Sequence, residues 1–145
     1  MNRFFCLVIL LLSSTQALAA CPRQSSLSGK KYSSYIEVYS GGNRLVDICL
    51  LRGQFNSDGT EFSGSGYCTT TPVGVASFSV ATRLETADYN VRECIARVAG
   101  TTSTSGGQVV AFTGTTALSL NGKAFDTVSF ASQTGFHYVE RGVLQ

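Results

Sequence analysis

Polar and apolar residues alternate along most of the chain after residue 30, which is typical of strands with one buried face. Val46, Ile48 and Leu50 share one face of such a segment, and Val128 shares a face with Phe130. Runs rich in Val, Thr, Ser and aromatic residues are predicted as strands at 31–39, 44–55, 61–70, 75–84, 108–120, 124–131 and 136–143.

Short turn signals separate these runs. They include Gly41-Gly42-Asn43, Asp58-Gly59, Ser105-Gly106-Gly107 and Asn121-Gly122. Because nearly every link has hairpin length, the predicted fold is all-β, a single antiparallel up-and-down barrel of about eight strands. Closure of such a barrel also removes exposed sheet edges. One domain over residues 21–145 accounts for the whole pattern.

The segment 83–99 has two interpretations. Leu84, Ala87, Val91 and Cys94 fall at helical spacing, which predicts one short helix around 83–99. Tyr, Val and Ile in the same segment favour extended structure, which predicts two strands joined near Arg92. A barrel tolerates either outcome.

The first twenty residues are predicted to be a signal peptide. Arg3 supplies the positive start, residues 4–12 form an apolar core, and Ala17-Leu18-Ala19 is a cleavage motif. The apolar core is too short for a membrane-spanning helix, which needs about 20 apolar residues. The expected localisation is therefore secreted or periplasmic, with no transmembrane segment.

A second motif overlaps the cleavage region. Leu18-Ala19-Ala20-Cys21 resembles the lipobox of bacterial lipoproteins, in which the cysteine carries the lipid. This alternative anchors the protein to a membrane through Cys21. Pro22 directly after the cysteine disfavours it.

Four of the five cysteines follow the predicted leader, and in an exported chain they are expected to form two disulfides. If Asp58-Gly59 is a two-residue turn, the numbers of paired residues add up to 117, so Cys49 faces Cys68 and Cys21 is left for Cys94. That turn places the first pair at a hydrogen-bonded site, where side chains stand farther apart, so either a one-residue bulge intervenes or the pairing is wrong. The spacing contains no C-x-x-C motif, and no metal or other cofactor is predicted.

Composition narrows the function classes. The 145 residues include 11 Lys+Arg and 9 Asp+Glu, only 14% of the chain is charged, and the charges are scattered. A basic patch for nucleic acid or for an anionic membrane surface is therefore not expected.

Residues suited to catalysis are few. His137 is the only histidine, and Gly64-Ser65-Gly66 lacks the G-x-S-x-G pattern of a nucleophile elbow. No catalytic residue is assigned. The expected function is that of a non-enzymatic binding module; the alternative is a barrel-type enzyme, cyclase-like or isomerase-like, that uses Glu93, His137 or Glu140 as acid or base.

Four residues are candidates for ligand binding. Tyr35 and Tyr138 combine a large ring with a polar tip, as binding surfaces often do. Glu93 and Arg97 could form an ion pair that orients a polar ligand inside the barrel.

Several segments together resemble a known group. They are Leu27-Ser28-Gly29-Lys30-Lys31-Tyr32, the hairpin 52–59 followed by Phe62-Ser63-Gly64-Ser65-Gly66, Tyr89 with Val91 and Cys94, and 136–142. Over most of the mature chain they resemble small exported bacterial proteins of calycin-like form, related in shape to lipocalins and avidins. The resemblance implies the barrel fold, and the group has no settled activity to carry over. The binding module expected from the residues would hold a small apolar ligand in the barrel mouth or dock a protein partner, including as an inhibitor. The chain departs from lipocalins and avidins because it has no Trp.

Overall fold

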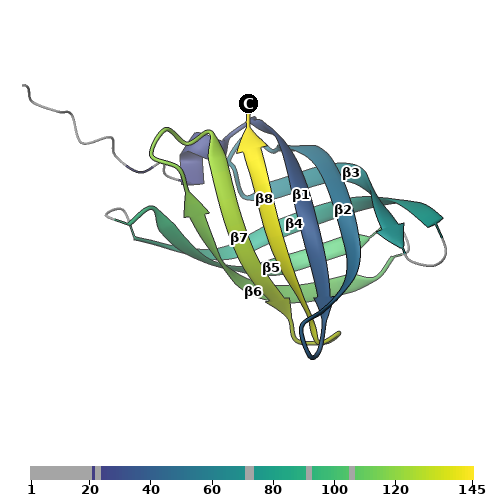
Figure 1. The fold of residues 1–145 in the computed structure, drawn as a ribbon. Coiled ribbons are helices and arrows are strands. Elements are labelled where there is room, and N and C mark those ends of the chain that lie inside the picture. Colours follow the sequence, from purple (N-terminus) through teal and green to yellow (C-terminus); the bar gives the residue numbers. More distant parts are fainter. Residues whose placement is uncertain (1–20, 22–23, 71–73, 91–92, 105–106) are drawn as a thin grey trace, which may run out of the picture.

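In a computed structural model, which describes residues 21, 24–70, 74–90, 93–104 and 107–145, the chain forms a closed antiparallel barrel of eight strands (Figure 1). The strands follow one another in chain order around the barrel, and β8 pairs with β1. The up-and-down barrel is thereby confirmed. The predicted signal peptide at 1–20 lies outside the described residues. The elements are η1 (Gln24–Leu27), a 3-10 turn, and β1 (Lys31–Ser40), β2 (Arg44–Phe55), β3 (Glu61–Thr70), β4 (Gly74–Asn90), β5 (Ile95–Thr104), β6 (Val109–Leu118), β7 (Ala124–Ala131) and β8 (Phe136–Leu144).

Of the two interpretations of 83–99, the two strands are confirmed and the helix is wrong for the described part of that segment. β4 continues to Asn90 and β5 begins at Ile95, with residues 91–92 outside the described part. The register between these strands shifts between Leu84 and Thr86, so that Leu84 is opposite Gly100 and Ala87 is opposite Val98. The shift pairs residues three apart on one strand with residues two apart on the other. The bulge therefore accounts for the helix-like spacing of Leu84 and Ala87 on one face of β4.

The loop of the β2–β3 hairpin is longer than the expected two-residue turn. The Asn56 N–H donates to the carbonyl of Glu61 at 2.9 Å, so the loop spans residues 57–60. The register is unchanged, and Cys49 faces Cys68, but the alternation of hydrogen-bonded pairs moves by one position. The cysteines therefore occupy a non-hydrogen-bonded site, where side chains lie closer, and a bulge is not needed.

Both predicted disulfides are confirmed. Cys49–Cys68 joins β2 to β3, with Cα atoms 4.0 Å apart, and Cys21–Cys94 has Cα atoms 5.1 Å apart. The second disulfide fastens the segment before η1 to the connection between β4 and β5.

An apolar core fills one end of the barrel, where β1 begins and β8 ends (Figure 1). Its buried members are Tyr32, Leu51, Phe62 and Leu144, and the rings of Tyr32 and Phe62 have centroids 3.9 Å apart. Phe62 also covers Gly53, where an added Cβ would lie 2.4 Å from the ring. Glycine at this position lets the aromatic ring pack directly on the barrel wall.

The rest of the interior is filled less completely. The strand alternation that directs Tyr32 inward also directs Ile36 of β1 inward, and Ile36 keeps partial exposure, as do Phe78 and Phe125. Among the described residues no large side chain is fully buried. Because close-packed interiors normally bury such side chains, this barrel retains space beside its core.

Candidate functional site

Polar side chains gather midway along the barrel interior. Thr116 of β6 is opposite Thr127 of β7, Thr127 is opposite Glu140 of β8, and Glu140 is opposite Ile36 of β1. Ser34 lies two residues before Ile36 on the same face and is 5% exposed. We call Ser34, Thr116, Thr127 and Glu140 the interior polar cluster.

The hydrogen bonds of this cluster are incomplete. The Thr116 and Thr127 hydroxyls share a hydrogen bond of 2.9 Å. Ser34 Oγ and Glu140 Oε1, in contrast, are buried polar atoms without a hydrogen-bond partner in the described part of the chain. Leaving such an atom unpaired costs about 1–3 kcal/mol, so native proteins seldom keep two in one place without a reason.

Burial controls the electrostatics of the cluster. Burial raises the pKa of Glu140, and the nearby Ser34 hydroxyl opposes this shift only in part, without a hydrogen bond of normal geometry. Burial, together with the neighbouring Glu140, also raises the pKa of Tyr32. Glu140 therefore retains its proton to a higher pH than an exposed glutamate does.

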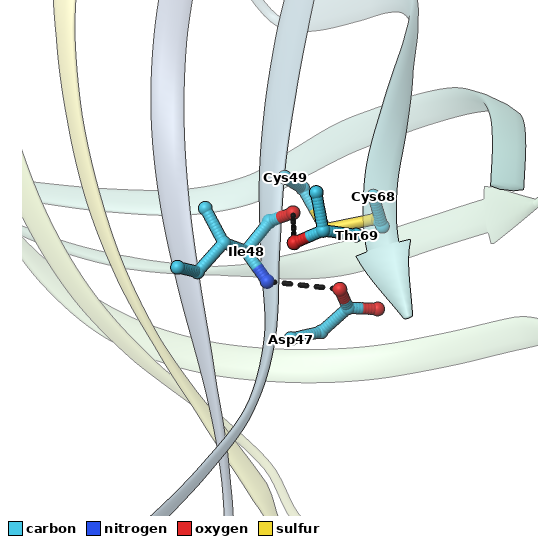
Figure 2. Close-up of a disulfide and its surroundings, with 5 residues drawn as sticks. All are labelled: Asp47, Ile48, Cys49, Cys68 and Thr69. Atoms are coloured by element: carbon cyan, nitrogen blue, oxygen red, sulfur yellow. Dashed lines mark hydrogen bonds between the residues drawn. A yellow bond between two sulfur atoms is a disulfide. The ribbon is translucent and has the colours of Figure 1, made fainter. Parts of the chain in front are cut away.

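The adjoining part of the wall, on β2 and β3, is mostly apolar and carries a disulfide. Leu51 is opposite Ser34, and the Cys49–Cys68 bridge follows along β2 and β3. Figure 2 shows Asp47 beside this bridge, where its carboxylate accepts the Ile48 N–H at 2.9 Å. Asp47 and the two sulfur atoms lie close enough for one metal ion, but the sulfur atoms are bonded to each other and offer no thiolate in this state.

The two candidate tyrosines lie on opposite faces of the barrel wall. Tyr138 points inward on β8, and burial raises its pKa. Tyr35 points outward on β1, between Leu50 and Arg141. The two rings therefore cannot contact one small ligand together.

Glu93 and Arg97 lie outside the interior. Glu93 is exposed in the β4–β5 connection and accepts a hydrogen bond from Asn90 Nδ2 at 3.0 Å. Arg97 is exposed on the outer face of β5. Within the described part of the chain the ion pair found is Arg141–Asp126, at 3.5 Å, and no Glu93–Arg97 pair occurs.

His137 also lies on the outer face. Its ring stacks on Tyr39 with centroids 4.9 Å apart and planes at 3°. The Tyr39 hydroxyl donates to Glu37 at 2.8 Å, and this hydrogen bond raises the pKa of Tyr39. Because Glu140 faces inward, His137 and Glu140 lie on opposite sides of the wall.

The outer surface of four strands carries large apolar side chains that are exposed. These side chains, which we call the outer apolar face, are Leu45 and Leu50 of β2, Tyr67 of β3, Val128 and Phe130 of β7, and Val143 of β8. A cavity of about 1060 Å³ is lined from both faces of the wall, by the outward-facing Tyr35, Leu50 and Tyr67 and by the inward-facing Ser34, Leu51 and Phe125 among others. Large exposed apolar areas often mark interaction surfaces.

Sequence reasoning missed most of the interior polar cluster. Ser34 alternates with Tyr32 and Ile36, so a serine on the buried face of β1 was the available signal. Thr127 follows Phe125 by two residues and gave the same weak signal. Glu140 was expected only as an enzyme's acid or base.

No protein-family model, no curated protein and no solved structure matches this chain. No helix in the described residues has the length and apolar character needed to cross a membrane.

Proposed function

We propose that this chain is an exported, non-enzymatic binding module whose barrel interior holds one small ligand with an apolar body and a polar end. The observation that carries this proposal is the pair of buried, unpartnered atoms Ser34 Oγ and Glu140 Oε1 in an incompletely filled interior. Small binding sites combine a mostly apolar lining with a few placed polar groups. An eight-stranded barrel is wide enough for one such ligand.

The proposed location is the periplasm or the extracellular medium. Two disulfides support it, because disulfides persist in oxidising compartments. The Cys21 sulfur is bonded to Cys94, and one sulfur cannot also carry the lipid of a lipoprotein. We therefore favour release over membrane anchoring. The resemblance to calycin-like proteins remains a hypothesis.

In the described part of the chain, the other two acid-base candidates of the enzyme alternative do not share the interior with Glu140. His137 lies on the other side of the wall and Glu93 lies in an exposed connection. An acid-base mechanism commonly needs two groups that reach the same substrate. Binding therefore fits the arrangement better than turnover does.

A titration with N-phenyl-1-naphthylamine, a dye that fluoresces in apolar surroundings, tests the proposal. We expect saturable binding of one dye per chain. Ser129→Phe places a ring on the inward face of β7 and should abolish binding, whereas Val128→Phe places the same ring on the outward face and should leave binding unchanged. Absence of saturation, or equal binding by the Ser129→Phe protein, would refute an interior site.

The outer apolar face supports a second candidate, a protein-docking function. Leu50 and Tyr67 are each more than 40% exposed and face each other across β2 and β3. If this face docks a protein, Leu50→Ser and Tyr67→Ser should remove a complex that chemical crosslinking captures from wild-type secretions. Dye binding would be unaffected in that case, so the two functions can be separated.

A further inference from the structure

We infer that Ser34 and Glu140 bind the ammonium group of a small amphiphilic amine inside the barrel. This inference rests on the proposed function and adds the chemical class of the ligand. The two residues lie on neighbouring strands, β1 and β8, and both offer oxygen atoms that the described protein atoms leave unpaired.

Charge distribution selects a cation over other polar groups. The buried and half-buried inward-facing titratable side chains that the structure describes are Tyr32, Asp47, Tyr138 and Glu140, none of which carries positive charge. Arg44, in register with Ser40 at the end of the barrel away from the core, is exposed. Arg141, next in sequence to Glu140, points outward to Asp126. A buried carboxylate is costly without an opposite charge, and an ammonium ion supplies that charge together with its hydrogen-bond donors.

The donors of an ammonium group match the available acceptors. Glu140 Oε1 accepts one hydrogen bond and Ser34 Oγ accepts another. The Thr116–Thr127 pair, next along the same interior row, adds hydroxyl oxygens. An anionic ligand such as a fatty acid would instead bring two carboxyl groups together, which is unfavourable unless one is protonated.

The apolar body of the ligand has a defined direction. On one side of Glu140 the core of Tyr32, Leu51, Phe62 and Leu144 fills the barrel. On the other side the inward row of Val38, Tyr138, Ser129, Gly114 and Val98 has smaller side chains on β5 to β7. The head group therefore lies deep, and the body extends away from the core.

Three probes with one chain length and different head groups test the inference by isothermal titration calorimetry. They are hexylamine, hexan-1-ol and hexanoate. For the wild-type protein we expect the amine to bind at least about tenfold more tightly than the alcohol, because hydrogen bonds to charged groups are about twice as strong as neutral ones. Hexanoate should bind more weakly than the alcohol.

Two substitutions assign the preference to the named residues. Glu140→Gln should reduce amine affinity to that of the alcohol and leave alcohol affinity within about twofold. Ser34→Ala should weaken amine binding by a smaller factor. Glu61→Gln, the same chemical change on an exposed residue of β3, should preserve the tenfold preference.

The outcomes separate this inference from the proposed function. Equal amine and alcohol binding, or a preference that survives Glu140→Gln, overturns the ammonium site while interior binding stands. Dye binding without hexylamine binding likewise overturns the ammonium site and leaves interior binding standing. If the dye does not bind, or if Ser129→Phe does not reduce its binding, the proposed function itself is overturned.

Discussion

The Cα atoms of Cys49 and Cys68 lie 4.0 Å apart at a non-hydrogen-bonded position between two strands that are already paired. Cys21 and Cys94, in contrast, connect the segment before the barrel to the end of the β4–β5 connection. The sequence separations are 19 and 73 residues. The two bridges therefore restrict the unfolded chain by different amounts.

We expect the loss of Cys21–Cys94 to destabilise the protein more than the loss of Cys49–Cys68. Chain entropy alone gives roughly 4 kcal/mol for the first and roughly 3 kcal/mol for the second. Urea denaturation of the two double-alanine variants measures the difference. A larger loss for the Cys49→Ala, Cys68→Ala protein would show that loop entropy does not govern these bridges.

The intact mass of the exported protein should correspond to two disulfides and no lipid. Each bridge removes two hydrogens, so reduction should add about 4 Da in total, as expected for two bridges. The Cys21 sulfur, held by Cys94, should carry no diacylglycerol. Mass spectrometry with and without reductant makes the measurement. A lipid-sized mass increase in a membrane fraction would contradict both expectations.

Glu140 should make the folded protein less stable as pH rises from acid to neutral. Its folded pKa lies above the value of about 4.3 in an unfolded chain, because burial disfavours the carboxylate. In the pH window between these two values the folded state binds more protons, so stability falls with increasing pH and stays low above the folded pKa. The groups around Glu140 are Tyr32 and Ser34 of β1 and Thr127 of β7. Of these three only Tyr32 titrates, and its pKa is raised above the ordinary tyrosine value, so it stays protonated throughout this pH window.

Glu140→Gln removes this pH dependence. We expect the variant to be more stable than wild type at pH 7 and to show no comparable fall across the window. Urea denaturation from pH 3 to pH 8 measures both curves, and Glu61→Gln provides an exposed control. Parallel stability curves for wild type and Glu140→Gln would mean that folding does not raise the pKa of Glu140.

Gly53→Ala should destabilise the barrel by about 1–3 kcal/mol, the range found for overpacked cores. An added Cβ would lie 2.2 Å from the Ser63 carbonyl oxygen and 2.4 Å from the Phe62 ring. Gly41→Ala is the matched control, because a Cβ there meets nothing within 4 Å. Thermal or urea unfolding compares the two variants; a similar small effect at both positions would mean that Phe62 moves aside freely.

The sequence predicted the barrel because local signals and topology agree in this chain. Turn residues at even intervals set the strands, and the sum of paired positions placed Cys49 opposite Cys68. The segment near Leu84 stayed undecided between helix and strand because a bulge alters the alternation of apolar residues, and the pairing that creates the bulge is not local. Helix and strand therefore could not be distinguished from the spacing alone.

The site was harder to predict than the fold. Alternation shows that Tyr138 and Glu140 share a face of β8, but it does not say whether that face is the interior. Ring closure between β1 and β8 decides this, and it depends on residues at both ends of the chain. Tyr35 was grouped with Tyr138 for its chemistry, although closure places it outside.

Tyr138→Ala should weaken dye binding about tenfold, whereas Tyr35→Ala should leave it unchanged. Tyr138 points into the interior beside Ser129, so truncation removes a large ring from the proposed binding surface. Tyr35 points outward between Leu50 and Arg141, so its loss should leave the interior surface unaltered. Fluorescence titration of both variants provides the comparison, with circular dichroism confirming that each barrel is folded. Weaker binding by the Tyr35→Ala protein alone would place the ligand on the outer surface beside Tyr35 and not in the interior.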